Sequence, residues 1–60
     1  MPFVKIEMFE GRTKEKKSRL IKEVSRVVSE ILEIPLDAVT VILIDLPKIN
    51  VGIAGVPAGE

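Results

Sequence analysis

The residue whose type and position best suit chemistry is Pro2, directly behind the initiator Met1. A small second residue such as proline permits removal of the methionine, which would leave a free secondary amine at the start of the chain. An α-amino group has a pKa much closer to neutrality than that of Lys, and apolar surroundings or a nearby cation lower it further. Pro2 is therefore a candidate general base. The structural explanation is that proline, which lacks an N–H, is tolerated at the start of a strand.

Arg12 is the second candidate, because it directly follows Gly11 at a break in the pattern of apolar residues. A guanidinium can hold a carboxylate through two hydrogen bonds, and its charge depresses the pKa of a neighbouring amine. An exposed loop arginine without a role is the alternative interpretation. Residue type and position alone do not decide between the two.

The composition narrows the available chemistry. The chain has no His, Cys, Trp or Tyr, so it lacks an imidazole base, a thiolate nucleophile and the ligands of the usual zinc sites. Any catalysis must use carboxylates, Lys, Arg, hydroxyl groups or the terminal amine. We expect neither a metal nor another cofactor.

A basic run allows a different interpretation. Six of residues 12–22 are basic and only one is acidic; the basic ones are Arg12, Lys14, Lys16, Lys17, Arg19 and Lys22. Such a run can bind RNA or another polyanion. No aromatic residue is interleaved for base stacking, so a solvated helix face is favoured. The glycines of VGIAG, residues 51–55, are not followed by a helical pattern and therefore do not indicate a phosphate loop.

These candidates must be positioned by a strand and a helix. Residues 2–9, PFVKIEMF, alternate apolar and polar side chains, which predicts a half-buried strand. From residue 14 to about residue 33 the apolar residues recur with helical spacing and predict an amphipathic helix. Thr13 is a suitable N-cap, and Pro35 is expected to end the helix.

The second half of the chain predicts another strand and an arm. VTVILID, residues 39–45, is apolar on both faces except at Thr40, which is typical of a parallel strand covered on both sides. Strand, helix and strand indicate a right-handed βαβ unit, an α/β fold with two parallel strands. The tail after residue 46, rich in Gly and Pro, predicts a small hairpin or an extended arm. We expect residues 1–60 to form a single domain.

The small size of the chain predicts self-association. A domain of 60 residues buries little apolar surface to offset the entropy of ordering, and this chain has no cysteine for a disulfide. Its hydrophobic content is nevertheless 47%. One helix covers only one face of a sheet, so another subunit must cover the second face. We therefore predict an obligate oligomer whose subunit faces become its core.

The charge and hydropathy patterns indicate a soluble protein. Nine basic and nine acidic residues cancel, so no net field attracts nucleic acid or an anionic membrane. No apolar run reaches the roughly 20 residues of a membrane span, and the start of the chain lacks a signal-peptide pattern. We expect a cytoplasmic protein with no nucleic-acid or membrane partner.

Taken together, these motifs resemble the 4-oxalocrotonate tautomerase family, the short-chain members of the tautomerase superfamily. The resemblance covers essentially the whole chain, and its most specific parts are MPFVKI, FEGRTKEKKSRLIKEVS and NVGIAG. It implies that Pro2, once Met1 is removed, is the general base and that Arg12 binds a substrate carboxylate. It also implies βαβ subunits that pair into four-stranded sheets, with three such dimers in a homohexamer.

Two positions depart from the family pattern. Thr40 stands where the best-known members have a second arginine that polarises the substrate, and a hydroxyl brings no charge. Val51 stands where many members have an aromatic wall, and it keeps the pocket apolar. The resemblance places both residues at the substrate. Loss of one cationic donor costs about 3 kcal/mol of transition-state stabilisation, and Lys48, or an Arg or Lys of another subunit, is a candidate replacement.

The resemblance predicts an isomerase that moves a proton in enolic 2-oxo acids, such as 2-hydroxymuconate-like or enolpyruvate substrates, with low or promiscuous activity because of Thr40. Two alternatives stay open: a non-catalytic assembly protein with the same oligomer, and a hydratase-like relative that acts on unsaturated acids. If Met1 is retained, the Pro2 nitrogen is an amide and cannot act as a base. Retention would therefore favour the assembly protein.

Overall fold

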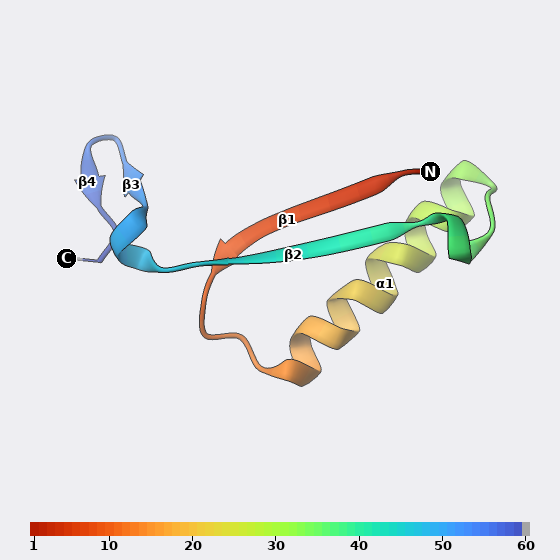
Figure 1. The fold of residues 1–60 in the computed structure, drawn as a ribbon, viewed down its shortest axis with the longest axis horizontal. Coiled ribbons are helices and arrows are strands. Elements are labelled where there is room, and N and C mark those ends of the chain that lie inside the picture. Colours follow the sequence, from red (N-terminus) through yellow and green to blue (C-terminus); the bar gives the residue numbers. More distant parts are fainter. Residues whose placement is uncertain (60) are drawn as a thin grey trace.

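A computed structural model describes residues 1–59 of the chain. The elements in chain order are β1 (Phe3–Phe9), α1 (Lys14–Leu32), β2 (Thr40–Leu46), β3 (Gly52–Ile53) and β4 (Val56–Pro57), with 3₁₀ turns at Leu36–Ala38 and Lys48–Asn50. Strands β1 and β2 are parallel and joined through α1, whereas β3 and β4 form an antiparallel hairpin (Figure 1). The predicted α/β fold, a βαβ unit with a C-terminal hairpin, is confirmed. Both long strands begin one residue later than predicted.

The N-terminus of α1 is fixed by a side-chain cap and an ion pair. Thr13 has an extended backbone, and its hydroxyl accepts a hydrogen bond from the backbone N–H of Lys16 at 3.2 Å, which confirms the predicted N-cap. One turn further on, Lys17 forms an ion pair with Asp45 of β2. The cap and the ion pair together fix the start of the helix relative to the sheet.

The C-terminus of α1 ends at a left-handed residue. Leu32 is the last helical residue, and Glu33 has a φ of 55°. The backbone N–H of Ile34 donates to the carbonyl of Ser29 at 3.1 Å, which satisfies a carbonyl that the helix leaves free. The helix therefore ends at Leu32, two residues before Ile34, whose conformation Pro35 constrains. This end lies within one residue of the predicted one.

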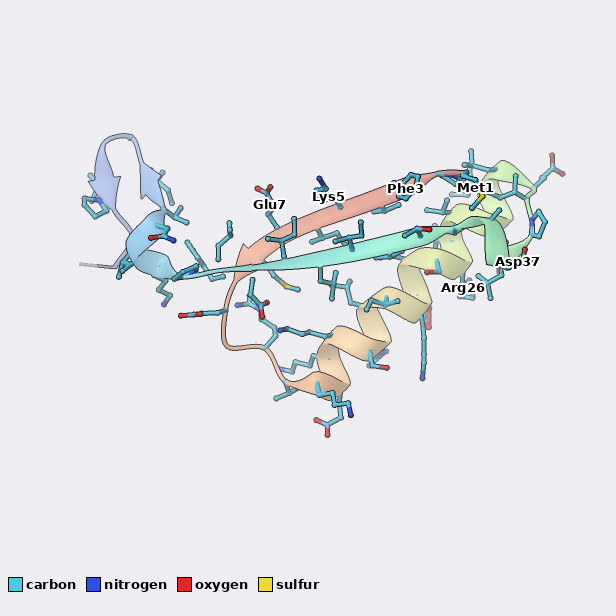
Figure 2. The ribbon with its side chains drawn as sticks, in the orientation of Figure 1. Met1, Phe3, Lys5, Glu7, Arg26 and Asp37 are labelled. Atoms are coloured by element: carbon cyan, nitrogen blue, oxygen red, sulfur yellow. The ribbon has the colours of Figure 1, made fainter. Side chains whose placement is uncertain are left out.

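The two faces of the sheet differ in what covers them. Paired residues of parallel strands point to the same face, and the register sets Phe3 opposite Thr40 and Phe9 opposite Leu46. The face against α1 carries mainly apolar side chains, namely Val4, Ile6, Met8, Val41 and Leu43, together with Asp45. Figure 2 shows Phe3, Lys5 and Glu7 pointing away from the helix. This second face, hereafter the open face, has no cover within the described chain.

The chain is elongated rather than compact. Its extents are 43 × 24 × 14 Å, and its radius of gyration of 14.4 Å exceeds the roughly 10 Å of a compact domain of this length. Its accessible surface is 4805 Å², against roughly 3,900 Å² expected for a folded monomer of this mass. The β3–β4 hairpin extends beyond the end of the sheet and contributes to this elongated shape (Figure 1).

The described residues lack a buried core. No residue among 1–59 is buried, and large apolar side chains are exposed on three surfaces. The exposed fraction is 68% for Phe3 on the open face, 74% for Ile31 on α1 and 66% for Ile53 on the hairpin. Apolar surface of this extent marks contact sites for a partner. Within the same residues, no helix is long and apolar enough to cross a membrane.

Candidate active site

Pro2 and Thr40 lie together at one end of the sheet. Pro2 directly precedes β1 and is half-buried, and its carbonyl accepts a hydrogen bond from the backbone N–H of Thr40 at 3.1 Å. This contact follows from the parallel register, because the first residues of β1 and β2 are paired. Met1 is 81% exposed. While Met1 is attached, the Pro2 nitrogen is an amide, whose lone pair is delocalised into the carbonyl and does not take up a proton.

Arg12 and Val51 lie together at the opposite end of the sheet. They line an open groove of about 400 Å³, with the rest of its wall formed by Glu7, Met8, Phe9 and Leu46. This wall is mostly apolar, and the guanidinium of Arg12 donates to the Phe9 carbonyl from its Nη1 atom at 3.4 Å. We call this the Arg12 groove. A groove of this size with an apolar wall and a few charged groups suits a small organic acid.

The length of β1 separates the two pairs. Its seven residues extend over about 23 Å at roughly 3.3 Å per residue. Pro2 and Arg12 of one chain therefore cannot contact the same small acid. The structure brings Pro2 to Thr40 and Arg12 to Val51, but it does not unite the two pairs within one chain.

Phe9 and Lys48 lie at or beside the Arg12 groove; Phe9 was not among the predicted site residues, whereas Lys48 was predicted as a candidate replacement for the missing cation. Phe9 lines the groove, and the Lys48 amine lies 5.9 Å from the centre of the Phe9 ring. Phe9 provides an aromatic surface beside Val51, where the sequence indicated only an aliphatic wall. The sequence contained one signal for Phe9: it is an apolar residue on the face of the predicted strand that otherwise carries the polar residues Lys5 and Glu7.

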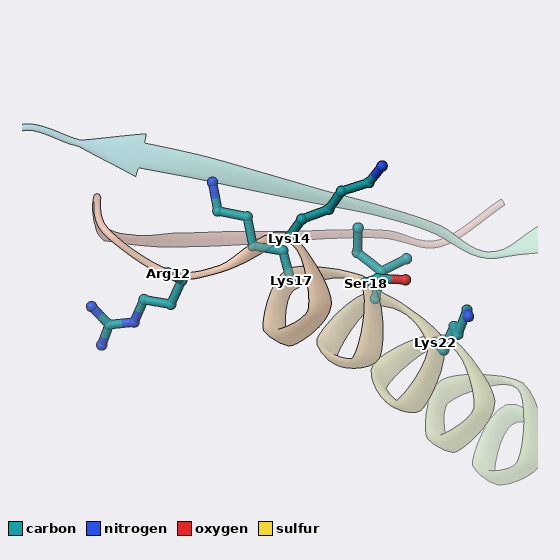
Figure 3. A pocket seen from close by; sticks show the side chains of 6 residues that line it. Arg12, Lys14, Lys17, Ser18 and Lys22 are labelled. Carbon is teal, nitrogen blue, oxygen red and sulfur yellow. The ribbon is translucent and has the colours of Figure 1, made fainter.

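The basic run does not form a comparable site. Arg12, Lys14, Lys17, Ser18, Ile21 and Lys22 line a second open groove, of about 480 Å³. Figure 3 shows the Arg12 guanidinium pointing away from the amino groups of Lys14 and Lys17. Lys17 is moreover paired with Asp45. These cations therefore do not converge on one anion, which favours a solvated helix face.

Residues 1–59 contain no cluster of three or more His, Cys, Asp or Glu side chains that could hold a metal ion.

Of the described titratable groups, Arg26 has a clearly shifted pKa, which is raised by hydrogen bonds to Glu23 and then to Glu30. Arg26 is an exposed helix residue and does not line the Arg12 groove.

Comparison with known proteins identifies the family. The model of the tautomerase enzyme family matches residues 2–60. The 2-hydroxymuconate tautomerase of Stutzerimonas stutzeri is 46% identical over 55 residues, which cover 92% of this chain and 87% of that protein. The chain thus belongs to the tautomerase family and is a tautomerase-like isomerase.

Solved structures agree with this assignment. A 4-oxalocrotonate tautomerase isozyme from Methylibium petroleiphilum superposes with a TM-score of 0.90 at 41% identity, over 97% of this chain and 94% of that one. The heterohexamer 4-oxalocrotonate tautomerase from Chloroflexus aurantiacus superposes with a TM-score of 0.93 at 28% identity, over 100% of this chain and 97% of that one. The βαβ unit and the hairpin are therefore features that this chain has in common with the family.

Proposed function

We propose that this protein moves a proton within enolic 2-oxo acids, with Pro2 as the general base after removal of Met1. The observation that carries the proposal is the position of Pro2, half-buried at the start of β1 and held through its carbonyl by Thr40. The high exposure of Met1 leaves it accessible for removal. The 2-hydroxymuconate tautomerases among the relatives support an enolic 2-oxo acid as the substrate class.

In this reaction the Pro2 amine takes the proton of the 2-hydroxyl group and becomes positively charged. The electron pair of the broken O–H bond forms the C=O bond. The electron pair of the carbon–carbon double bond then takes the proton back from Pro2 and forms a C–H bond. Atoms and electrons balance without an oxidant or a reductant. A nearby cation such as Arg12 favours the neutral amine, which is the form that accepts the proton.

The proposed site combines two copies of the chain. Because β1 separates Pro2 from Arg12 by about 23 Å within one copy, the Pro2 end of one chain must meet the Arg12 groove of another. Arg12 of that second copy then holds a substrate carboxylate through paired hydrogen bonds. Val51 and Phe9 exclude water from the groove wall.

Self-association follows from the same structure. The described chain has no buried residue and an open sheet face, so a second copy is needed to provide a core. A relative from Chloroflexus aurantiacus is a heterohexamer. We propose a homohexamer in which three dimers each join two βαβ units through their sheets.

The substrate preference depends on Thr40. Thr40 lies beside Pro2 but carries no charge, so it stabilises a developing enolate less than an arginine would. We propose low or promiscuous activity toward simple enolpyruvates for this reason.

An enol-to-keto assay on the processed protein tests the proposal. The rate is compared between the wild type and Pro2→Ala, after intact-mass measurement establishes that both lack Met1. Pro2→Ala leaves a primary amine that lacks the fixed position of the ring nitrogen, so the rate is expected to fall by up to about 10²- to 10⁴-fold, the contribution of a positioned general base. Equal rates in the two proteins would reject Pro2 as the base.

The second candidate is a non-catalytic assembly protein, and the uncharged Thr40 beside Pro2 is the observation that favours it. This candidate requires the oligomer but not a free amine. Intact-mass measurement of the protein from its native cell separates the two functions, because retained Met1 leaves an amide at Pro2. Removal of Met1 together with measurable turnover would reject the assembly protein.

A further inference from the structure

Asp45 is the one charged side chain on the face of the β1–β2 sheet that lies against α1. The register of the two strands gives every other position of this face an apolar residue. A carboxylate on such a face is costly unless a partner offsets the cost. Here the partner is the amine of Lys17, which lies one turn after the cap residue Thr13. The charge at this position is therefore explained by its contact with the helix and not by packing of the sheet.

The ion pair lies beside the Arg12 groove. In the register of the sheet Asp45 is paired with Met8, and the next residue of β2 is Leu46. Both Met8 and Leu46 line the Arg12 groove. The carboxylate that holds the helix thus belongs to the strand segment that forms the groove wall.

The loop between β1 and α1, residues 10–13, is held at both of its ends by this strand segment. At the start of the loop, the backbone N–H of Glu10 donates to the carbonyl of Leu46 at 3.0 Å. Beyond its end, the side chain of Lys17 forms the ion pair with Asp45. The loop therefore lies between two anchors on consecutive residues of β2.

Arg12, within this loop, has only a weak contact of its own. Its Nη1 atom donates to the carbonyl of Phe9 at 3.4 Å, which is longer than a typical hydrogen bond. The preceding residue, Gly11, has a φ of 115°, so the chain turns there in a conformation that other residues rarely adopt. The location of the guanidinium therefore depends on the two anchors of the loop.

We propose that Asp45 and Lys17 are positioning residues for Arg12. Their ion pair holds the loop so that the guanidinium stays at the groove and meets the substrate carboxylate. The inference rests on the proposed function, in which Arg12 binds that carboxylate. The side chains of Lys17 and Asp45 are 30% and 40% exposed, so the pair contributes little to stability. Its loss is expected to move the loop without unfolding the chain.

Two variants with opposite changes in charge test this assignment by steady-state kinetics with an enolpyruvate. By electrostatics alone, Asp45→Asn would tighten the binding of an anion at the groove, whereas Lys17→Met would loosen it. The proposal expects both variants to raise KM about tenfold, within the roughly hundredfold cost of a misplaced binding group. The double variant is expected to be no worse than either single one. A lower KM in Asp45→Asn than in wild type would overturn the assignment, because charge and not position would then determine binding.

The control is Glu30→Gln, which breaks an ion pair with Arg26 on α1, outside the Arg12 groove. It is expected to leave KM unchanged, and a similar rise in this control would overturn the assignment. In an Arg12→Ala background, Asp45→Asn is expected to raise KM no further, because the residue that it positions is gone. A full additional rise in that background would also overturn the assignment, since a general loosening of the fold acts without Arg12.

Amide hydrogen exchange requires no turnover and separates this inference from the proposed function. Asp45→Asn is expected to speed exchange of the Glu10 amide about tenfold, because the loop that it begins opens more often. Glu30→Gln is expected to leave this rate unchanged. If exchange and KM both rise in Asp45→Asn while Pro2→Ala is fully active, the general base is wrong and the assignment of Asp45 stands. If either quantity is unchanged in Asp45→Asn, the assignment is wrong whatever the role of Pro2.

Discussion

The chemistry of Pro2 depends on a single peptide bond. With Met1 attached, the nitrogen is an amide, and Pro2 is only a suitable first residue for a strand. Without Met1 the same atom is a secondary amine that can accept a proton. The half-buried position and the contact with Thr40 are well suited to hold such an amine in place. The function of this residue is thus decided by processing and not by a change in fold.

Thr40→Arg is expected to raise activity. Thr40 lies beside Pro2, so an arginine there would provide the cationic donor that a developing enolate lacks, with a gain in kcat of up to about a hundredfold. Enol-to-keto assays of the processed variant measure the gain. Thr40→Val, which adds no charge, is the matched control and should not gain. If the arginine variant gains nothing while it assembles normally, Thr40 does not face the reacting atoms.

At the scale of the elements, α1 is positioned by its ends more than by its surface charges. Thr13 caps the first turn, and Lys17 joins that turn to β2 through Asp45. The Arg26 pairs with its glutamates are exposed and contribute little to stability, as exposed ion pairs generally do. The start of the helix also determines where the loop with Arg12 lies relative to β1. A loss of the cap would therefore affect both stability and the site.

Thr13→Ala is expected to lower the free energy of unfolding by about 1 kcal/mol per subunit, because the N–H of Lys16 loses its acceptor. Urea unfolding at one fixed protein concentration measures the loss, since the stability of an oligomer depends on concentration. Thr13→Ser retains a hydroxyl and should lose only a few tenths of this value. Equal losses in the two variants would show that packing of the methyl group, and not the cap, stabilises the helix start.

At the scale of the whole molecule, the described chain is an incomplete unit. One face of its sheet is open, its hairpin extends beyond the sheet, and none of residues 1–59 is buried. The two halves of the proposed site lie at opposite ends of β1, because a two-stranded parallel sheet is long and narrow. In the proposed homohexamer, association of copies provides a core and a complete site in one step.

Mixed oligomers are expected to regain activity lost in two separate variants. Arg12→Ala chains keep Pro2, and Pro2→Ala chains keep Arg12, so a site contains both groups where an Arg12→Ala chain provides Pro2 and a Pro2→Ala chain provides Arg12. Random mixing of equal amounts gives about a quarter of the wild-type activity, because each site draws its two halves from different copies. Activity is measured after joint refolding, with each variant refolded alone as the control. If the mixture is as inactive as its parts, both groups come from the same chain.

The sequence by itself determined the elements and the candidate residues. Alternating and helical apolar spacing predicted β1 and α1 within one residue, and Thr13 was predicted correctly as the cap, because these features depend on local interactions. The assignment of the family from the motifs around Pro2 and Arg12 was confirmed by comparison. The roles of Pro2, Arg12, Thr40 and Val51 stay predictions.

Only the tertiary structure decided which candidates lie together. The parallel register of β1 and β2 sets Phe3 opposite Thr40 and so brings the Thr40 N–H to the Pro2 carbonyl. It leaves Arg12 about 23 Å away, a separation that no local pattern encodes. The return of the chain after β2 places Lys48 over Phe9, although the two residues are far apart in the sequence. Local interactions specify strands and helices, but distances between them arise from packing. For this reason the sequence named Pro2 and Arg12 as candidates, whereas the structure shows that in one chain they lie too far apart to contact the same small acid.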